Sequence, residues 1–280
     1  MEIQQSPLFR TYITSLKWQV LSFEDIAIYT NRVPVYGQFA KIQRPKELPY
    51  LPTFIPFLKK HHIQTILAEA SYGTDQKEFS QWLTSLSKFF RIVKEPFLAT
   101  KTILIDLTAK EEVIFSRLKE SKRRAVRRAE KHGITISAST NIQELIKIKA
   151  KAAGMFGSIT TYGIDRLWNI CTPNHGAILL AHKKNSNTVV GGVLLLFWEG
   201  TAYYWIAGAT KEGKKLFAPT LLVWEALRFG KKQGAKQFDF VGVWDERTPK
   251  LYTSWKGFTK FKEEFGGVPI YYPLISMLHR

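Results

Sequence analysis

The sequence predicts an α+β protein made of two halves, each a mixed sheet flanked by helices. Helical and strand patterns alternate through both halves of the chain. The length of 280 residues suits about two domains of roughly 150 residues each. Hydrophobic residues make up 45% and aromatic residues 14%, which is typical of a chain that buries a core and excludes intrinsic disorder. We expect a first domain over residues 1–107 and a second over residues 108–280.

Helices and strands alternate in the first third of the sequence. Ser6 is a typical N-cap residue and Pro7 suits the first helical position, so a helix is expected from there to about Lys17. Apolar side chains that share one side of residues 74–90 predict an amphipathic helix. Elsewhere we expect a short helix that ends at His61 and strands over residues 19–30, 33–43, 63–67 and 102–107.

The rest of the chain has a more regular predicted order. A long helix over residues 110–132 is closed by Gly133, at the usual position of a C-terminal glycine. The elements that follow are strand 134–139, helix 141–153, a loop and short helix within 155–171, strands 177–182, 189–197 and 201–207, helix 219–233 and strand 238–243. A loop or short helix up to residue 265 and a last segment over residues 269–272 complete the chain's expected order. Three successive strands, a helix and a strand are the order of an N-acyltransferase (GNAT-like) domain. Because the first third has a similar rhythm, we expect two GNAT-like domains in tandem.

Composition excludes several classes of protein. The single cysteine, Cys171, cannot form an internal disulfide, and no Cys and His residues have the spacing of zinc ligands. The longest apolar stretch, Val189 to Trp198, contains two glycines and is too short to span about 30 Å of hydrocarbon. Residues 1–18 are polar and lack the apolar core of a secretion signal. We therefore expect a soluble, cytoplasmic protein without a metal site.

Positive charge is concentrated in one segment. The chain has 41 Lys and Arg against 23 Asp and Glu, a net charge of +18. Eight of the basic residues lie between Arg117 and Lys131, where the only acidic residues are Glu120 and Glu130. This pattern favours a polyanionic partner: nucleic acid, an anionic membrane surface or a phosphorylated substrate. The alternative is a solvated helix face. The candidate contact residues are Lys122, Arg123, Arg124, Arg127, Arg128 and Lys131.

The second half contains motifs in a recognisable order. Leu104 to Ile136 is a strand followed by the basic helix that ends in A-E-K-H-G. The later motifs are Tyr204–Ala209, Leu221–Leu227, Phe238–Gly242 and Gly257–Gly266. In order and spacing, they resemble the Fem family of peptidoglycan-bridge aminoacyltransferases over roughly residues 100–270, and more loosely over the first third.

The resemblance implies an enzyme that takes an amino acid from aminoacyl-tRNA and joins it to an amine on the stem peptide of a peptidoglycan precursor. This acceptor is either lipid-linked or nucleotide-linked, which places the protein in the cytoplasm or at the inner face of the cell membrane. The donor ester is already activated, so no metal or cofactor is implied beyond aminoacyl-tRNA as co-substrate. The protein must position the amine, help it lose a proton and offset the charge that develops on the carbonyl oxygen.

The same resemblance implies the site residues. The lysine of the family's F-K pair maps onto Lys262, which is expected to be catalytic by holding a phosphate or stabilising an oxyanion. Its alternative role is a surface ion pair with a neighbouring glutamate. Tyr204, Asp239, Gly242 and Phe261 are expected to bind substrate. As alternatives, Tyr204 is a packing residue, and Asp239 and Gly242 shape the end of a strand.

One departure from the family concerns the acceptor. The family's pattern Q-S-x-x-W/F-x-x-x-K ends in a lysine that binds the precursor's phosphates. In this sequence the frame Gln5–Phe9 places Ile13 at the lysine position. Arg10 or Lys17 is the expected substitute. The family's P-R-G-P segment is also missing, and Arg44, followed by a proline, is the expected replacement for part of it.

Two other functions are open. An acyl-CoA-dependent GNAT enzyme holds the CoA pyrophosphate with backbone N–H groups of a glycine-rich loop before a helix. The corresponding loop, Gly208–Pro219, has no such glycine pair before the helix, and Pro219 lacks an N–H group. A non-catalytic RNA-binding protein would explain the charge, but the usual RNA-binding motifs do not occur in the sequence.

Overall fold

The computed structural model describes residues 1–153, 161–184 and 188–275. The chain forms two compact units. Unit 1 comprises Met1–Lys101 and the segment that begins at Ile270, and unit 2 comprises Thr102–Pro269. The predicted division lies after residue 107, and residues 101–106, just before it, form a strand that pairs within the sheet of unit 2. The expected fold class is confirmed, since each unit has its own mixed sheet flanked by helices.

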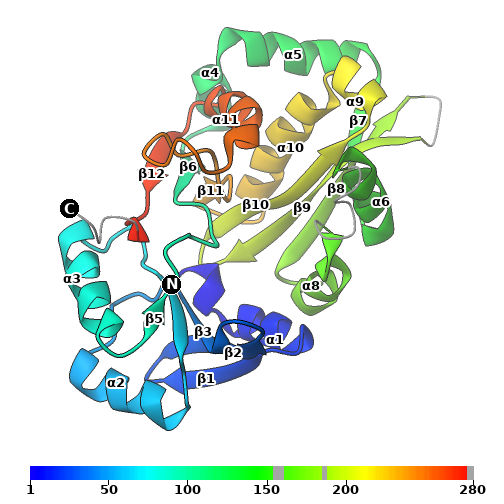
Figure 1. The fold of residues 1–280 in the computed structure, drawn as a ribbon. Coiled ribbons are helices and arrows are strands. Elements are labelled where there is room, and N and C mark those ends of the chain that lie inside the picture. The colour runs from blue at the N-terminus through cyan, green and yellow to red at the C-terminus, as the bar shows by residue number, and fades with distance from the viewer. Residues whose placement is uncertain (154–160, 185–187, 276–280) are drawn as a thin grey trace. The chain divides into compact units, whose positions relative to one another are not determined.

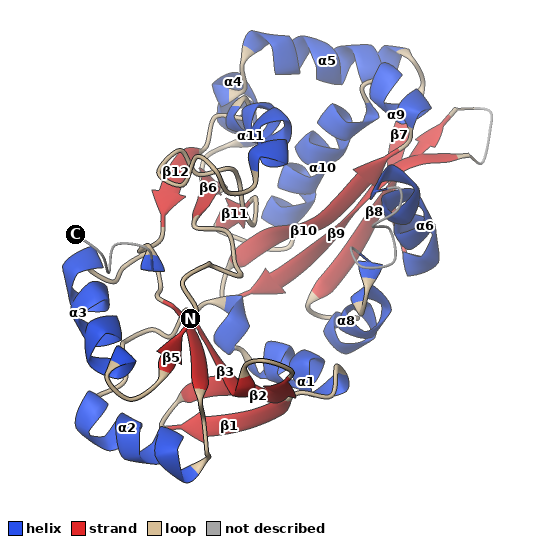
Figure 2. Cartoon of the chain, viewed as in Figure 1, coloured by secondary structure: helices blue, strands red, loops and turns tan. Residues whose placement is uncertain are grey.

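Unit 1 builds a five-stranded sheet (Figures 1 and 2). Its elements in chain order are η1 (Ile3–Gln5), α1 (Pro7–Ser15), β1 (Gln19–Phe23), β2 (Ile26–Val33), β3 (Gly37–Gln43), α2 (Leu51–Lys60), β4 (Thr65–Glu69), α3 (Gln76–Ser87) and β5 (Arg91–Ile92). The strands lie side by side in the order β1-β2-β3-β4-β5. The pairs β1–β2 and β2–β3 are antiparallel, whereas β3–β4 and β4–β5 are parallel.

The core of unit 1 lies between this sheet and the helices α2 and α3. Ile28, Ile42 and Ile66, from three neighbouring strands, are almost completely inaccessible to solvent. They cluster with Phe54 of α2 and Phe79 of α3. Successive side chains of a strand point to opposite faces of the sheet, so every second strand residue faces these helices.

An N-cap and a tight turn determine the first elements of unit 1. The Ser6 hydroxyl accepts the N–H of Phe9 at 3.1 Å, as expected of an N-cap residue. The single strand expected over residues 19–30 was wrong. The chain forms two antiparallel strands there, because Glu24 adopts a left-handed conformation (φ 54°) and reverses the chain direction together with Asp25.

Unit 2 builds a seven-stranded sheet. Its elements in chain order are β6 (Lys101–Asp106), α4 (Glu111–Arg117), α5 (Glu120–Lys131), β7 (Ile134–Ser139), α6 (Ile142–Ala153), α8 (Ile164–Cys171), β8 (Gly176–Lys183), β9 (Val189–Trp198), β10 (Thr201–Ala209), α9 (Lys211–Lys215), α10 (Ala218–Lys232), β11 (Gln237–Asp239), η3 (Thr253–Trp255), α11 (Lys256–Glu263) and β12 (Val268–Tyr271). The strand order is β12-β6-β11-β10-β9-β8-β7. Part of the loop expected within 155–171 lies outside the described residues. No helix in the described ranges combines the length and apolar character needed to cross a membrane.

Helices cover both faces of the unit 2 sheet (Figure 2). A Cβ atom on Gly191 would lie 3.0 Å from Leu222 of α10, and one on Gly192 would lie 3.2 Å from Leu145 of α6. Because successive strand residues point to opposite faces, α10 packs on one face and α6 on the other. The strands β10 and β11 are parallel, whereas β11 pairs with β6 and β10 with β9 in antiparallel fashion.

The long helix expected over residues 110–132 was wrong, because the chain breaks it into α4 and α5. Leu118 and Lys119 are extended between them, with ψ values of 142° and 148°. The Leu118 side chain is buried, and the Lys119 N–H donates to the carbonyl oxygen of Glu264 at 2.9 Å. The Arg123 guanidinium donates to the Leu118 carbonyl at 2.5 Å. These contacts satisfy backbone groups that the break leaves outside a helix.

Candidate functional site

Two parallel strands of the unit 2 sheet part at the candidate site. Strands β10 and β11 pair over three positions, the last of which joins Tyr203 to Asp239. β10 then continues beside β9, with a β-bulge at Trp205. Such bulges re-aim side chains and are common next to active sites. The strand expected over residues 238–243 is therefore shorter than predicted, because the chain leaves the sheet after Asp239.

The Lys262 side chain occupies the turn that follows β11. Its nitrogen donates hydrogen bonds to the carbonyl oxygens of Phe240 at 2.8 Å and Gly242 at 2.7 Å. The same nitrogen lies 4.9 Å from the centre of the Phe258 ring, within the range of a cation–π interaction. Lys262 and Phe258 are four residues apart on α11 and therefore share one face of that helix.

Asp239 shapes the turn around Lys262. After β11 the backbone takes positive φ angles at Val241 (61°) and Gly242 (136°). Glycine tolerates such angles, but a β-branched residue does not adopt them without strain. The buried Asp239 carboxylate offsets this strain by accepting the Val241 N–H at 2.7 Å and the Thr102 hydroxyl. The predicted residues Asp239 and Gly242 thus bring two carbonyl oxygens to one lysine nitrogen.

The surroundings of Lys262 favour its neutral form. Burial lowers the pKa of Lys262 to about 7, with a smaller contribution from the Lys149 ammonium, whereas the Asp239 carboxylate acts in the opposite direction. A neutral lysine amine has two N–H groups and one lone pair. It can donate to both carbonyls and still accept a proton, which is what a general base near neutral pH requires.

Lys149 is a second lysine of this site, and the sequence analysis missed it. Burial lowers the pKa of Lys149, and its ammonium lies within electrostatic range of Lys262. Across residues 1–153, 161–184 and 188–275, its ammonium has no hydrogen bond or ion pair. A Cβ atom on Gly208 would lie 3.3 Å from the Lys149 Cα atom, so α6 packs directly on β10 beyond the bulge.

A sequence signal for Lys149 does exist. Ile142 and Leu145 are buried residues of α6, and Lys149 follows them at the spacing that keeps all three on one helix face. A lysine in an apolar stripe is unusual, since lysine is almost never fully buried without a partner.

Where the structure describes the chain, it gives no comparable indication of a metal site. The described parts of the chain contain no cluster of three His, Cys, Asp or Glu side chains that could ligate an ion.

Tyr204 and Phe261 lie among aromatic side chains. Tyr204 is buried, its ring centre is 5.6 Å from that of Phe240, and burial raises its pKa. The Phe261 ring contacts Phe265 at 5.2 Å, and the Lys122 ammonium lies 4.1 Å above it. These contacts place both predicted substrate-binding residues in the packing around the Lys262 turn and helix.

The six basic residues predicted as contacts divide into two groups. Lys122 forms an ion pair with Glu264 at 3.1 Å, and Arg123 donates to backbone carbonyls, so both are engaged within unit 2. The others are exposed and spaced at i, i+3, i+4 and i+7, which places them on one face of α5. We call this group the basic stripe: Arg124, Arg127, Arg128 and Lys131.

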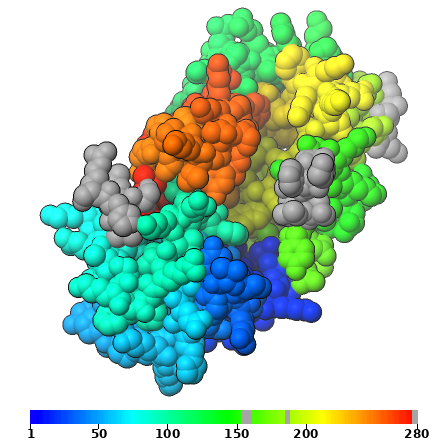
Figure 3. All heavy atoms as spheres, viewed as in Figure 1, coloured from blue at the N-terminus to red at the C-terminus, as the bar shows by residue number. Residues whose placement is uncertain are grey.

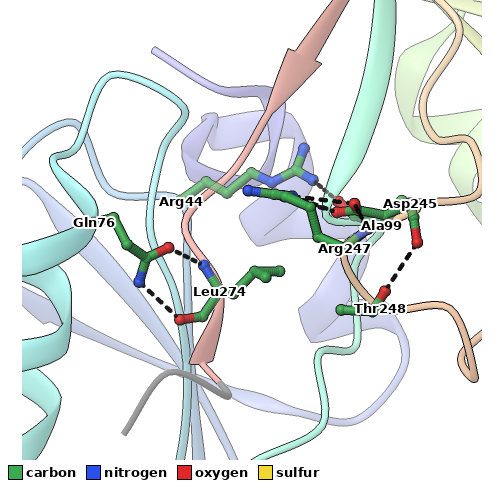
Figure 4. A network of polar contacts seen from close by, with 7 residues as sticks. All are labelled: Arg44, Gln76, Ala99, Asp245, Arg247, Thr248 and Leu274. Carbon is green, nitrogen blue, oxygen red and sulfur yellow. Dashed lines mark hydrogen bonds and ion pairs between the residues drawn. The ribbon is translucent and has the colours of Figure 1, made fainter. Parts of the chain in front are cut away.

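Three predicted residues belong to unit 1. Arg10 donates to the Asp25 carbonyl at 2.6 Å, while its Nε, although buried, has no hydrogen-bond partner within the described chain. Lys17 is exposed just after α1 with a positive φ of 65°. Arg44 is buried and donates to the carbonyl oxygen of Ala99 at 2.7 Å (Figure 4). Of the three, Lys17 is the one whose side chain is exposed to solvent.

Comparison with known proteins places this site in a familiar fold. FemX is 14% identical in sequence, with a TM-score of 0.77 over 97% of this chain and 90% of its own. L-PGS from Bacillus licheniformis is 13% identical, with a TM-score of 0.60 over 95% of this chain and 86% of its own. A tandem GNAT protein from the clavulanic acid biosynthesis pathway is 9% identical, with a TM-score of 0.54 over 88% and 76%. The chain therefore has the tandem GNAT fold of the Fem type.

The sequence comparison identifies the family. No curated protein sequence matched the chain. The model of the acetyltransferase (GNAT) domain, in contrast, matches residues 116–256. This range includes α5, the meander of β8 to β10, α10, and the turn that holds Lys262 by its carbonyl oxygens. Because the match extends over half of the sequence and the fold agrees with it, the chain belongs to the acetyltransferase (GNAT) domain family.

Proposed function

We propose that this protein is an aminoacyltransferase that moves an amino acid from aminoacyl-tRNA to an amine on the stem peptide of a peptidoglycan precursor. One observation carries the proposal: Lys262, with a pKa of about 7, is held by two carbonyl oxygens where β10 and β11 part. The order of the Fem-like motifs and the likeness to the FemX fold support the choice of donor and acceptor. The protein would act in the cytoplasm or at the inner face of the cell membrane.

The reaction forms one amide bond and breaks one ester bond. The acceptor amine attacks the ester carbonyl carbon, the bond from that carbon to the ribose oxygen breaks, and the oxygen leaves as a hydroxyl. The proton lost by the amine is the one that the leaving oxygen needs. In our proposal neutral Lys262 accepts this proton and then returns it, and its charged form stabilises the negative carbonyl oxygen in between. The atoms therefore balance without a further reactant.

The neighbouring residues receive roles on the same grounds. Asp239 and Gly242 would keep Lys262 in position, and Tyr204 and Phe261 would shape the space for the donor or acceptor. In unit 1, Arg10 or Lys17 would contact the phosphates of the precursor, and the exposure of Lys17 favours it. The basic stripe would contact tRNA phosphates or an anionic membrane surface, since its four residues are exposed.

A second candidate function is acyl transfer from acyl-CoA to another amine. The family match favours it, because the family is described as an acetyltransferase domain. The segment before α10 argues against it. Phe217 precedes this helix in a left-handed conformation and Pro219 lies in its first turn, so the helix start offers fewer N–H groups to a pyrophosphate.

The decisive experiment measures transfer of label from charged tRNAs to purified lipid-linked and nucleotide-linked precursors. We expect labelled precursor from the wild-type protein and none after RNase treatment of the donor. Lys262→Ala should lower kcat/KM by roughly a hundredfold or more, the usual contribution of a general base. Lys236→Ala is the matched control, since this exposed lysine lies just before β11 and its backbone hydrogen bonds join it to Gly200 and Leu107.

Each alternative has its own signature in the same assay. Label that appears from acyl-CoA but not from tRNA would establish the second candidate. RNA binding without transfer from either donor would leave a non-catalytic RNA-binding protein. Transfer that survives Lys262→Ala unchanged would remove Lys262 from the mechanism.

A further inference from the structure

Three aromatic rings follow one another beside the candidate site, and the first two are stacked. Tyr252 and Trp255 are nearly parallel, with ring centres 4.4 Å apart and an angle of 20° between the planes. The Phe258 ring follows, with its centre 5.3 Å from that of Trp255 and its plane tilted by 45°. The Lys262 nitrogen lies 4.9 Å from the other end of this series, the Phe258 ring. We call Tyr252, Trp255 and Phe258 the aromatic ladder.

The ladder is held in a fixed conformation by its own segment. Tyr252 adopts a left-handed backbone conformation (φ 51°), and its carbonyl accepts the Trp255 N–H at 2.8 Å. η3 then continues directly into α11, where Thr259 is buried and its hydroxyl accepts the Trp244 N–H at 2.7 Å. Upstream, the Asp245 carboxylate accepts hydrogen bonds from the Arg247 guanidinium, the shortest at 2.7 Å (Figure 4). These contacts hold the backbone that carries the rings.

Two rings of the ladder are partly accessible to solvent. Tyr252 is 38% exposed and Phe258 is 37% exposed, although burial of an aromatic side chain would normally favour folding. The segment that carries the rings lies at the surface of unit 2 (orange in Figure 3). Exposed lysines accompany the rings along the chain: Lys250, Lys256 and Lys260.

This combination selects one kind of partner. Flat rings bind other flat rings, and the three lysines favour a partner with regularly spaced negative charge. Unpaired nucleotides offer both, since each has an exposed base and a phosphate. In a duplex the bases are stacked on one another and are not available to protein side chains.

We infer that the aromatic ladder is a stacking platform for unpaired nucleotides of RNA, which it leads toward Lys262. The inference rests on the proposed function for its biological meaning, because a tRNA ends in unpaired nucleotides and the last of them bears the aminoacyl ester. Its physical content is separate: bases stack on the ladder, and Lys250, Lys256 and Lys260 contact the phosphates.

The test uses the full-length protein and uncharged RNA, so that it does not depend on acyl transfer. Fluorescence anisotropy measures binding of a short labelled single strand ending in CCA and of a blunt hairpin at the same salt concentration. We expect Phe258→Leu and Tyr252→Leu each to weaken single-strand binding roughly tenfold, since leucine keeps apolar volume but loses the flat ring. Phe258→Tyr should retain binding, which shows that the ring matters and that the variant segment folds.

A matched control and a second partner complete the test. Tyr50→Ala removes an aromatic ring that is 68% exposed in unit 1, and it should leave RNA binding unchanged. Equal single-strand binding by the wild type, Phe258→Leu and Tyr252→Leu would overturn the inference. So would ladder-dependent binding to phosphatidylglycerol vesicles with unchanged RNA binding, which would assign the rings to a membrane surface.

The outcomes separate this inference from the proposed function. If the protein transfers no label but binds the single strand in a ladder-dependent way, the proposed function is wrong and the role of the ladder is supported. If the ladder variants transfer label with an unchanged KM for aminoacyl-tRNA, the ladder does not bind the donor and the proposed function is retained.

Discussion

At the scale of single residues, the lowered pKa of Lys262 makes the proposed reaction dependent on pH. The neutral amine is the form that accepts a proton, and it predominates above the pKa of about 7. We therefore expect kcat/KM to increase as the pH rises toward 7 and to level off above it. A lysine in water would place the same increase near pH 10.4. The measurement is a pH profile of the transfer assay between pH 5 and 9, a range set by the pKa.

Lys149 provides a second test of this pH dependence. Its ammonium contributes to lowering the pKa of Lys262, so Lys149→Met should raise that pKa and move the increase in kcat/KM to higher pH. Lys147→Met is the matched variant, because Lys147 is exposed on the same helix and pairs with Glu144. A profile that stays in place in Lys149→Met, or moves equally in both variants, would contradict our account.

The sequence predicted part of this residue-level arrangement. Lys262 was found because it stands in a motif, and the motif is local. Lys149 was missed because its position depends on packing of α6 against Gly208, which lies far along the chain. Arg123 was predicted as a partner contact, and its guanidinium instead binds the carbonyls of Ser116 and Leu118. Charge patterns indicate how much basic surface a helix has, but not which of its side chains fold back.

At the scale of elements, the turn after β11 depends on one buried carboxylate. Asp239→Ala would leave the buried Thr102 hydroxyl and the partly buried Val241 N–H without this acceptor. Hydrogen bonds to a buried charge contribute roughly 1.5–3 kcal/mol each, so the free energy of unfolding should fall by about 3 kcal/mol. Urea denaturation followed by circular dichroism measures this change.

Asp106 provides the matched comparison. It also accepts a backbone N–H and a hydroxyl, both from Thr108, but it is exposed at the end of β6. Water replaces these contacts when the carboxylate is removed, so Asp106→Ala should change the free energy of unfolding by less than about 1 kcal/mol. Similar losses in the two variants would show that burial of Asp239 does not determine its contribution.

Helices and strands were predicted correctly where the local sequence pattern determines them. They were predicted wrongly where contacts with residues distant in sequence determine where they begin or end. The amphipathic pattern of α3 and the glycine after α5 indicated those elements correctly. The break between α4 and α5 depends on Lys119 donating to Glu264, a residue on another element. The early end of β11 depends on the φ of Val241, which the Asp239 carboxylate stabilises. The letters F-D-F-V-G-V by themselves are typical of a strand that continues.

At the scale of the whole molecule, fold and charge have separate origins. The α+β class of two mixed sheets was predictable, because each half repeats the alternation of apolar faces that its own core requires. The likeness to FemX holds over 97% of the chain at 14% identity, so most surface residues are free to differ without loss of the fold. The net charge of +18 bears on solubility, non-specific binding and association rates rather than on the fold.

The distribution of that charge leads to a test with salt. If the basic stripe binds RNA phosphates, the affinity for uncharged tRNA should fall with salt concentration, and the logarithmic slope should become shallower by roughly 3 when its four residues are changed to Gln. The control carries the same loss of four charges in unit 1, at exposed lysines: Lys46, Lys60, Lys77 and Lys88. It should leave most of the slope intact, because long-range attraction contributes far less than direct phosphate contact once salt screens it. Equal slopes for the two variants would mean that RNA binding depends on the net charge of the protein and not on the position of the basic stripe. A slope unchanged by the stripe variant, together with lost binding to phosphatidylglycerol vesicles, would assign the stripe to a membrane.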